Sequence, residues 1–372
     1  MSAALDSVLR SEGTLVVKIG SSLLINDDGR PREHWMANLT QRLSSREGPI
    51  VLVSSGAIAL GRSALDLESR PSLLAQAQAA AAVGQIHLAE AWSRAWQAQD
   101  RVAAQILLTL GDLEQRRRYL NARATLETLL ERGIVPVVNE NDTVATEEIR
   151  FGDNDRLAAR VAQLLGAEGL ILLSDVNGLY DRDPGHHYDA QHIPLVDMIT
   201  PEIEAMAGAS ASTDVGTGGM VSKLAAARIA TAGGVPVWLA SGLSDDPIQA
   251  LIDGGRHTEF AASVRPLAQR KQWLSGLQQV AGTLLIDSGA AKALHSGASL
   301  LAVGLNGVFG EFERGDVVLI EDERGVIGKG LSAYSAEDAS RIAGCKSKEI
   351  EQRLGGVSRG AVIHRDDIVL EG

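Results

Sequence analysis

The sequence has one cysteine, Cys345, in 372 residues. A single cysteine excludes a disulfide within the chain and any zinc site built from several thiolates, and it is typical of a reducing compartment. No apolar run reaches the roughly 18 residues that a membrane-spanning helix needs. The first residues, MSAALDSVLRSEG, lack the basic and then apolar pattern of a secretion signal. These absences predict a cytoplasmic protein that does not enter a membrane.

An excess of positive charge is also missing. The chain has 35 Lys and Arg against 47 Asp and Glu, a net charge of −12. Nucleic acids and anionic membranes attract basic surfaces, so general binding to either is not expected. A protein of this charge that handles anionic substrates must concentrate cations locally, which makes single lysines informative. With 45% hydrophobic residues the chain can bury a large core, and its length suggests two or three domains.

Short apolar runs alternate with helical patterns along the first two thirds of the chain. The predicted strands are 14–19, 49–55, 103–110, 134–140, 170–176 and 235–241, and the predicted helices are 33–46, 72–98, 114–132, 154–166 and 219–233. Alternation of this kind favours an α/β fold, a three-layer αβα sandwich with a mainly parallel sheet. Ligands of such folds bind at the carboxyl ends of the strands.

The pattern changes after about residue 242, where polar and basic stretches lead to short strands separated by glycine. We expect one domain over residues 10–262, a linker over 263–279 and a small β-rich domain over 280–370. Strands of the small domain are predicted at GTLLID, SLLAVGL, DVVLIED, VIGKGLSAY and AVIHRDD, with one helix at SAEDASRIAG.

A glycine-rich stretch, VGTGGMVSK (215–223), raises the question of an anion site. In a P-loop the lysine directly follows the last glycine, whereas Lys223 lies four residues after Gly219. That spacing puts the lysine about one helical turn further on, with its side chain directed back toward the start of the helix. The stretch is therefore not a P-loop. Taken alone, it fits a turn that opens a surface helix as well as it fits a phosphate site.

Two other turns follow predicted strands. Lys18 lies inside the apolar VVKIGSS, just before Gly20. Lysines are rarely buried without an anionic partner, so an anion contact is favoured over a strand-end lysine that reaches solvent. The second turn, VSSGAIALG, places Ser55 and Gly56 between a strand and a helix. Because neither G-x-S-x-G nor a positioned histidine accompanies Ser55, we expect backbone and hydroxyl contacts there rather than nucleophilic catalysis.

The densest polar cluster is VVNENDTVATEEIRFGDNDRLAARVA (137–162). A calcium loop that starts at Asp153 is excluded, because its sixth position is Ala158 and its twelfth is Leu164. A helix cap accounts for one residue of the DND triplet. Two acids around an asparagine exceed what a cap needs, and they suit holding cationic side chains or Mg²⁺ beside a nucleotide.

Two more features follow the strand LILLSDV. Ser174 and Asp175 precede a glycine turn, which is a natural place for nucleotide contacts. The nearby HHYDAQH contains three histidines, but their spacing matches no known metal site, and a solvated loop is the favoured interpretation.

Taken in order, VVKIGSS, VSSGAIALGR, VPVVNENDTV, FGDNDRLAA, LLSDVNGLY and GTGGMVSKLAAA resemble the amino acid kinase family over nearly the whole chain. The resemblance is strongest to the members that phosphorylate glutamate, and the β-rich tail resembles the PUA domain that many of them carry. It implies transfer of a phosphoryl group from ATP to the γ-carboxylate of L-glutamate, the first step of proline biosynthesis, with Mg²⁺ required. It also implies feedback inhibition by proline and a homo-oligomer.

The resemblance assigns roles to residues of this chain. Lys18 and Lys223 would contact the transferring phosphoryl group, and Asp155 would orient both lysines. Glutamate would be bound by Ser55, Gly56, Asp142 and Asn154. ATP would be bound by Lys18, Gly20, Ser174, Asp175, Thr217, Gly218, Gly219, Met220, Val221, Ser222 and Lys223, and no protein ligand of a metal is assigned. Ser174, where many relatives have threonine, and Asn177, where many have an acid, depart from the pattern without removing a needed group.

Two alternatives stay open. One is another kinase of the same family, acting on N-acetylglutamate, aspartate, carbamate or a nucleotide. The other is RNA binding through the PUA-like tail, against which charge argues. Residues 280–372 hold 10 Lys and Arg against 14 Asp and Glu, a net charge of 10 − 14 = −4, and few aromatic residues to stack on bases.

Overall fold

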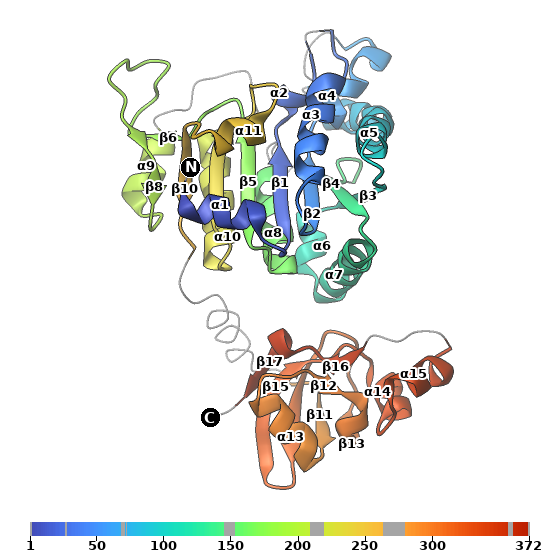
Figure 1. Cartoon of the computed structure of the whole chain (residues 1–372). Coiled ribbons are helices and arrows are strands. Elements are labelled where there is room, and N and C mark those ends of the chain that lie inside the picture. Colours follow the sequence, from blue (N-terminus) through green and yellow to red (C-terminus); the bar gives the residue numbers. More distant parts are fainter. Residues whose placement is uncertain are drawn as a thin grey trace. The chain divides into compact units, whose positions relative to one another are not determined.

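The computed structural model of the chain describes residues 2–26, 28–67, 71, 73–144, 153–208, 219–262, 280–355 and 360–370 (Figure 1). It separates into two compact units, one of residues 1–114 and 122–264 and the other of residues 115–121 and 265–372. The predicted linker, 263–279, lies outside the described residues.

The first unit is built on an eight-stranded sheet in the order β3-β4-β2-β1-β5-β9-β10-β8 (Figure 1). Its strands are β1 (Leu15–Ile19), β2 (Ile50–Ser54), β3 (Ala103–Leu108), β4 (Val135–Glu140), β5 (Gly169–Ser174), β8 (Leu195–Val196), β9 (Val237–Ser241) and β10 (His257–Phe260). Neighbouring strands from β3 to β9 run parallel, whereas β10 is antiparallel to β9. β1, β2, β4 and β5 are buried along their whole length, which explains why each reads as an apolar run.

Helices cover both faces of this sheet. They are α1 (Ala3–Arg10), α2 (Ser21–Leu24), α3 (Glu33–Ser44), α4 (Ala57–Gly61), α5 (Leu74–Gln97), α6 (Leu110–Glu114), α7 (Arg116–Glu131), α8 (Asp153–Leu165), α9 (Pro201–Gly208), α10 (Met220–Ala232) and α11 (Pro247–Ile252), with a 3-10 turn at Ser63–Leu65. α8 contacts β1, β2, β4 and β5. On the opposite face, Val17 and Ile19 of β1 join one core with Trp35 of α3 and Trp92 of α5. The three-layer αβα sandwich is therefore confirmed.

The alternation of side chains along β1 decides where its lysine goes. Val17 and Ile19 pack into the core on the α3 and α5 face. Lys18, between them, therefore points to the other face, where α8 and α10 lie. The strand pairs Lys18 with Val53 of β2 on one side and with Leu172 of β5 on the other. The side chain of Lys18 therefore lies over the middle of the sheet, on the face that α8 and α10 cover.

The second unit has a five-stranded sheet in the order β13-β11-β14-β15-β17 and a separate pair, β12 with β16. The strands are β11 (Gly282–Ile286), β12 (Leu300–Leu301), β13 (Leu305–Gly310), β14 (Val317–Asp322), β15 (Gly325–Leu331), β16 (Ala361–Ile363) and β17 (Ile368–Leu370). The helices are α13 (Ser288–His295), α14 (Ala336–Ile342) and α15 (Ser347–Arg353), with 3-10 turns at Ala302–Gly304 and Arg365–Asp367. Its core includes Phe312, Tyr334 and the lone Cys345.

Three expectations for this unit were wrong. The tail was expected to contain one helix, but α13 and α15 also form. Asp287 caps α13 by accepting from the N–H of Ala290 at 2.7 Å, a start signal that the strand-like spacing of glycines obscured. The run SLLAVGL is not one strand, because a 3-10 turn separates β12 from β13. In the run AVIHRDD, the strand β16 ends at Ile363 and a 3-10 turn follows.

The small elements of the first unit were also missing from the prediction, including α1, α9, α11, β8, β10 and the hairpin of β6 (Leu179–Tyr180) with β7 (His192–Ile193). Among the helices that the structure describes, none is long and apolar enough to cross a membrane.

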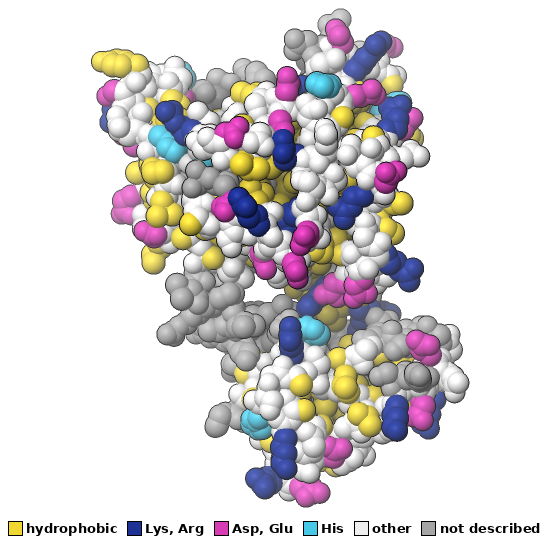
Figure 2. Space-filling model, in the orientation of Figure 1, with side chains coloured by type: hydrophobic (Ala, Val, Ile, Leu, Met, Phe, Trp, Pro, Cys, Tyr) yellow, Lys and Arg dark blue, Asp and Glu magenta, His cyan; other side chains and the backbone are white. Residues whose placement is uncertain are grey.

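Figure 2 shows acidic and basic side chains interspersed on the face in view, without an extended area of one sign.

Candidate active site

The carboxyl ends of the central parallel strands bring together residues from four turns. β1 is followed by Gly20, β2 by Ser55, β4 by Asn141 and β5 by Asp175. Parallel strands end at the same edge of a sheet, so these turns share one edge. The first turns of α8 and α10 complete the group, because Asp155 is the third residue of α8 and Lys223 is the fourth residue of α10.

The centre of the candidate site is one carboxylate shared by two lysines. Lys18 Nζ lies 2.5 Å from Asp155 Oδ1, and Lys223 Nζ lies 3.5 Å from Asp155 Oδ2. All three side chains are buried, with Asp155 fully inaccessible. The structure therefore brings the three predicted catalytic residues together, although their catalytic roles stay predictions.

The charges of this trio explain its pKa values. Burial disfavours the ionised form of Asp155, but Lys18 and Lys223 outweigh it and hold the pKa of Asp155 below its usual value. Burial lowers the pKa of Lys18, the carboxylate of Asp155 opposes that change, and Lys223 adds to it. Two cations on one carboxylate carry a formal surplus of one positive charge, which favours binding of an anion.

Ser222 joins the same carboxylate from the first turn of α10. Its Oγ donates to Asp155 Oδ2 over 2.8 Å and lies 3.0 Å from the carbonyl oxygen of Gly219. Gly219 is the N-cap of α10, followed by Met220 and the largely exposed Val221. The start of a helix is a suitable site for a phosphate. Thr217 and Gly218, the first residues of the predicted ATP stretch, lie outside the described residues.

Two predicted nucleotide residues lie where β5 ends, Ser174 as its last residue and Asp175 just after it. Ser174 is buried and its Oγ donates to Asp175 Oδ1 over 2.9 Å, whereas Asp175 is exposed. Asp175 acts on Lys18 over distance, because its charge raises the pKa of that lysine. Gly20 is the N-cap of α2, and its N–H donates to the carbonyl of Leu173 at 3.2 Å. These residues therefore surround Lys18 on the β5 side of β1.

The turn after β2 depends on a glycine. Gly56 has φ of +110°, a conformation that side-chain-bearing residues rarely adopt, and it caps α4. Just before it, the N–H of Ser55 donates to the carbonyl of Ile19 at 3.2 Å, which ties this turn to the end of β1. Ser55 and Gly56 therefore lie beside Lys18 on the β2 side of the sheet.

The turn after β4 and the first turn of α8 contain the remaining predicted substrate residues. Asn154 of α8 donates from Nδ2 to Asn139 Oδ1 at 3.0 Å and accepts from the N–H of Glu140 at 3.1 Å. Asp142 is half-buried in the turn that follows β4. Residues 145–152, between the two acidic clusters, lie outside the described residues.

One residue of this network was not found from the sequence. Gln85, in the middle of α5, accepts from Asn139 Nδ2 at 2.7 Å. It lies in an alanine-rich helix whose composition indicates only helical propensity, so no local signal pointed to it.

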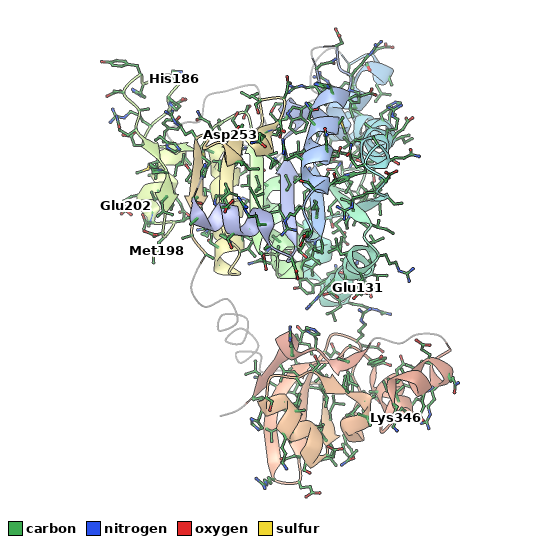
Figure 3. All side chains as sticks on the ribbon, in the orientation of Figure 1. Glu131, His186, Met198, Glu202, Asp253 and Lys346 are labelled. Carbon is green, nitrogen blue, oxygen red and sulfur yellow. The ribbon has the colours of Figure 1, made fainter. Side chains whose placement is uncertain are left out.

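Two of the three histidines contact other side chains of the same segment. His186 Nδ1 lies 3.0 Å from Asp183 Oδ2 in the loop between β6 and β7, and the residue lies at the edge of the unit, away from the central strands (Figure 3). His192 instead packs edge-on against Tyr180. Among the described residues, no three His, Cys, Asp or Glu side chains are arranged to hold a metal ion.

Lysine is rare in this part of the chain: within residues 1–264 of the sequence, the only lysines are Lys18 and Lys223. Both meet at Asp155. Lysine provides a compact charge whose pKa responds to burial, whereas arginine stays charged and presents a planar fork. The use of lysine at these two positions alone is typical of a chemical role.

This unit is a three-layer α/β fold in which two buried lysines lie at the carboxyl ends of the parallel strands, beside the start of a helix. These features are typical of a nucleotide-dependent phosphotransferase. The comparisons with known proteins specify the class. Residues 13–241 match the amino acid kinase family and residues 282–354 match the PUA domain. The chain belongs to the amino acid kinase family.

Curated relatives cover the chain almost completely. It is 52% identical to the glutamate 5-kinase of Paramagnetospirillum magneticum over 98% of this chain and 100% of that protein. It is also 52% identical to the glutamate 5-kinase of Rhizobium etli, over 96% of this chain and 92% of that protein. A solved structure of isopentenyl phosphate kinase aligns at 17% identity with a TM-score of 0.46, over 67% of this chain and 100% of that chain.

Proposed function

We propose that this protein transfers the γ-phosphoryl group of ATP to the γ-carboxylate of L-glutamate, which gives ADP and L-glutamyl 5-phosphate for proline biosynthesis. The relatives at about half identity over nearly the full chain are glutamate 5-kinases, which supports the reaction and the substrate. The observation that carries the proposal is the pair of lysines on Asp155.

The strand order supports a division of the site into two halves. β1 lies between β2 and β5, with β4 beyond β2. The residues predicted to bind glutamate follow β2 and β4 or begin α8. Apart from Lys18 and Gly20 at the end of β1, the described residues predicted to bind ATP lie at the end of β5 or at the start of α10. Lys18 of β1 therefore lies between the two halves, where a phosphoryl group would pass from one substrate to the other.

The chemistry needs positive charge more than it needs a base. The γ-carboxylate of glutamate is ionised at neutral pH, so it is already a nucleophile. The obstacle is repulsion between this carboxylate and the phosphates of ATP. Lys18 and Lys223 would neutralise the transferring group, and Asp155 would keep both amines in place.

Mg²⁺ would enter with the nucleotide, where it neutralises charge on the phosphates. The described residues fit an ion held mainly by phosphate oxygens and water, because Asp155 is already bonded to two lysines. Asp175, exposed and close enough to influence Lys18, is a carboxylate suited to the outer coordination of such an ion.

We further propose that proline inhibits the enzyme by competing at the glutamate half of the site, and that the chain forms a homo-oligomer through its kinase unit. Both proposals are supported by the membership of the family rather than by a contact in the structure. A cytoplasmic location fits the supply of ATP and glutamate.

Hydroxylamine, which traps acyl phosphates, tests the reaction. The protein is incubated with ATP, Mg²⁺ and L-glutamate, and hydroxamate and ADP are measured together. Parallel reactions contain N-acetylglutamate, aspartate, carbamate or UMP in place of glutamate. We expect glutamate to give by far the highest rate and proline to lower it. A higher rate with another acceptor, or hydroxamate formation that does not depend on glutamate, would contradict the proposed function.

A further inference from the structure

Three side-chain amides form a line from helix α5 to the first turn of α8. Gln85 Oε1 accepts from Asn139 Nδ2 at 2.7 Å, and Asn139 Oδ1 accepts from Asn154 Nδ2 at 3.0 Å. The backbone N–H of Glu140 donates to the Oδ1 atoms of both asparagines, at 2.9 and 3.1 Å. The line thus joins α5, β4 and α8, which are three separate elements of the first unit.

The order of donors and acceptors fixes how each amide is turned. A side-chain amide has an acceptor end and a donor end. Because the carbonyl oxygen of Gln85 faces Asn139, the NH₂ group of Asn139 points toward α5 and its oxygen points toward Asn154. Asn154 consequently turns its NH₂ group to Asn139 and its oxygen to the N–H of Glu140. The acceptor on Gln85 and the backbone N–H of Glu140 therefore set the direction of both asparagines together.

Burial makes the opposite arrangement costly. Asn139 is 1% exposed, so a flipped amide would place donors against the N–H groups of Glu140 and Asn154 without water to satisfy them. Asn154 is only half-buried. Its bonds to the other described residues use one N–H of its NH₂ group and leave the second for a ligand.

Helix α5 is a rigid base for this line because it packs directly on α4. A side chain added at Gly84 would place its Cβ 1.8 Å from the carbonyl oxygen of Ala57, and one at Gly61 would lie 1.9 Å from that of Ala80. The two backbones are therefore in contact at this point. The residue next to Gly84 is Gln85, so its side chain leaves a fixed position toward β4.

We propose that Gln85 is a positioning residue for glutamate binding, which acts by orienting Asn154 through Asn139. This inference rests on the proposed function and on the role assigned there to Asn154. Gln85 is not expected to touch either substrate itself. Its removal should weaken glutamate binding, while ATP binding on the β5 side of the sheet should not change.

Gln85→Met tests the inference, because methionine has a similar length and lacks the acceptor. A cavity of about 30 Å³ beside Gln85, Ala103 and Val137 gives the new side chain room. Gln97→Met, an exposed glutamine of the same helix, is the matched control. We expect Gln85→Met to raise the KM for glutamate about tenfold, with kcat and the KM for ATP changed by less than about twofold. Gln97→Met should equal the wild type.

A double-mutant cycle separates positioning from general support. If Gln85 acts through Asn154, Gln85→Met should no longer raise the glutamate KM in an Asn154→Ala background. Effects that multiply in the double variant would overturn the inference, as would an unchanged glutamate KM in Gln85→Met. Gln85→Ala, which removes the same oxygen, takes its place if the methionine variant does not fold. A wild-type protein without glutamate-dependent turnover would instead overturn the proposed function, and the inference with it.

Discussion

The ammonium groups of Lys18 and Lys223 bind different oxygens of one buried carboxylate, that of Asp155, at 2.5 and 3.5 Å. Lys18 belongs to the central strand and Lys223 to a helix that begins at the same edge of the sheet. The carboxylate lets two like charges stay close together in a buried place. It also leaves them with a surplus of positive charge that an anion can neutralise.

The pH dependence of turnover should report on this cluster. Burial lowers the pKa of Lys18 from its ordinary 10.5, and Lys223 lowers it further, while Asp155 opposes both. A protonated amine is needed at the phosphoryl group, so kcat should fall as the pH rises through this lowered pKa. Asp155→Asn should move the alkaline limb of the kcat profile to lower pH, and Lys223→Met should move it to higher pH. Identical limbs in all three proteins would show that Lys18 does not control the profile.

Lys223→Ala should lower kcat by about a hundredfold or more, which is the scale for removing one electrostatic stabiliser of a transition state. Lys223→Arg should not restore the rate, because a planar guanidinium cannot take the place of a compact amine against Asp155. Lys292→Ala, in α13 of the second unit, is the control and should behave as the wild type. Steady-state kinetics with saturating ATP and glutamate measure the effect, and near-normal turnover would refute the role.

Ser222→Ala should lower kcat about three- to tenfold, because the lost bond to Asp155 is one hydrogen bond to a charged group. Ser222→Thr keeps the hydroxyl and should recover most of the rate. The measurement is kcat at saturating substrates, with the KM for ATP determined alongside. If the alanine variant raises only the KM for ATP, the hydroxyl serves the nucleotide and not the carboxylate.

Asp142→Asn should mainly raise the KM for glutamate, because one charged partner of the substrate amine is lost. The half-buried position of Asp142 after β4 is consistent with contact to a ligand. Asp197→Asn, at an exposed loop position, serves as the matched control. Initial rates over a range of glutamate concentrations decide the matter, and a glutamate KM equal to that of the control would reject the assignment.

Much of the kinase unit could be predicted because its central strands are buried on both faces. β1, β2, β4 and β5 each read as an apolar run that ends in polar or glycine residues, and these ends are where the candidate site lies. The search for apolar runs did not find β8 and β10, the strands at one edge of the sheet. β8 has only two residues, and β10 alternates between buried and half-buried positions, so neither gives an apolar run.

The candidate site likewise contains residues that the sequence could single out and residues that it could not. Lys18 could be singled out because a lysine in an apolar strand is chemically unusual. Gln85 could not, because its partner Asn139 lies on a different element, β4, and becomes a neighbour only when the folded chain brings α5 onto the sheet. Contacts between distant elements depend on tertiary packing, which the local pattern of one helix does not contain.

Arg46 should support the fold without serving the reaction. It is 8% exposed, and its guanidinium donates to the carbonyls of Val8, Gly13 and Pro49 and to Ser11 Oγ. These acceptors include the end of α1 and the segment that leads into β1. Burial lowers the pKa of Arg46, which nevertheless remains charged at neutral pH.

Arg46→Met would leave several of these buried acceptors unpaired, so we expect the free energy of unfolding to fall by about 3 kcal/mol. Arg46→Lys should recover little, since one ammonium group cannot reach acceptors on both sides of the guanidinium. Arg132→Met, at an exposed arginine, is the control. Urea unfolding followed by circular dichroism gives the free energies, and kinetics at low temperature give the glutamate KM, which should stay unchanged. A loss of stability no larger than that of the control would mean that α1 and β1 hold together without this arginine.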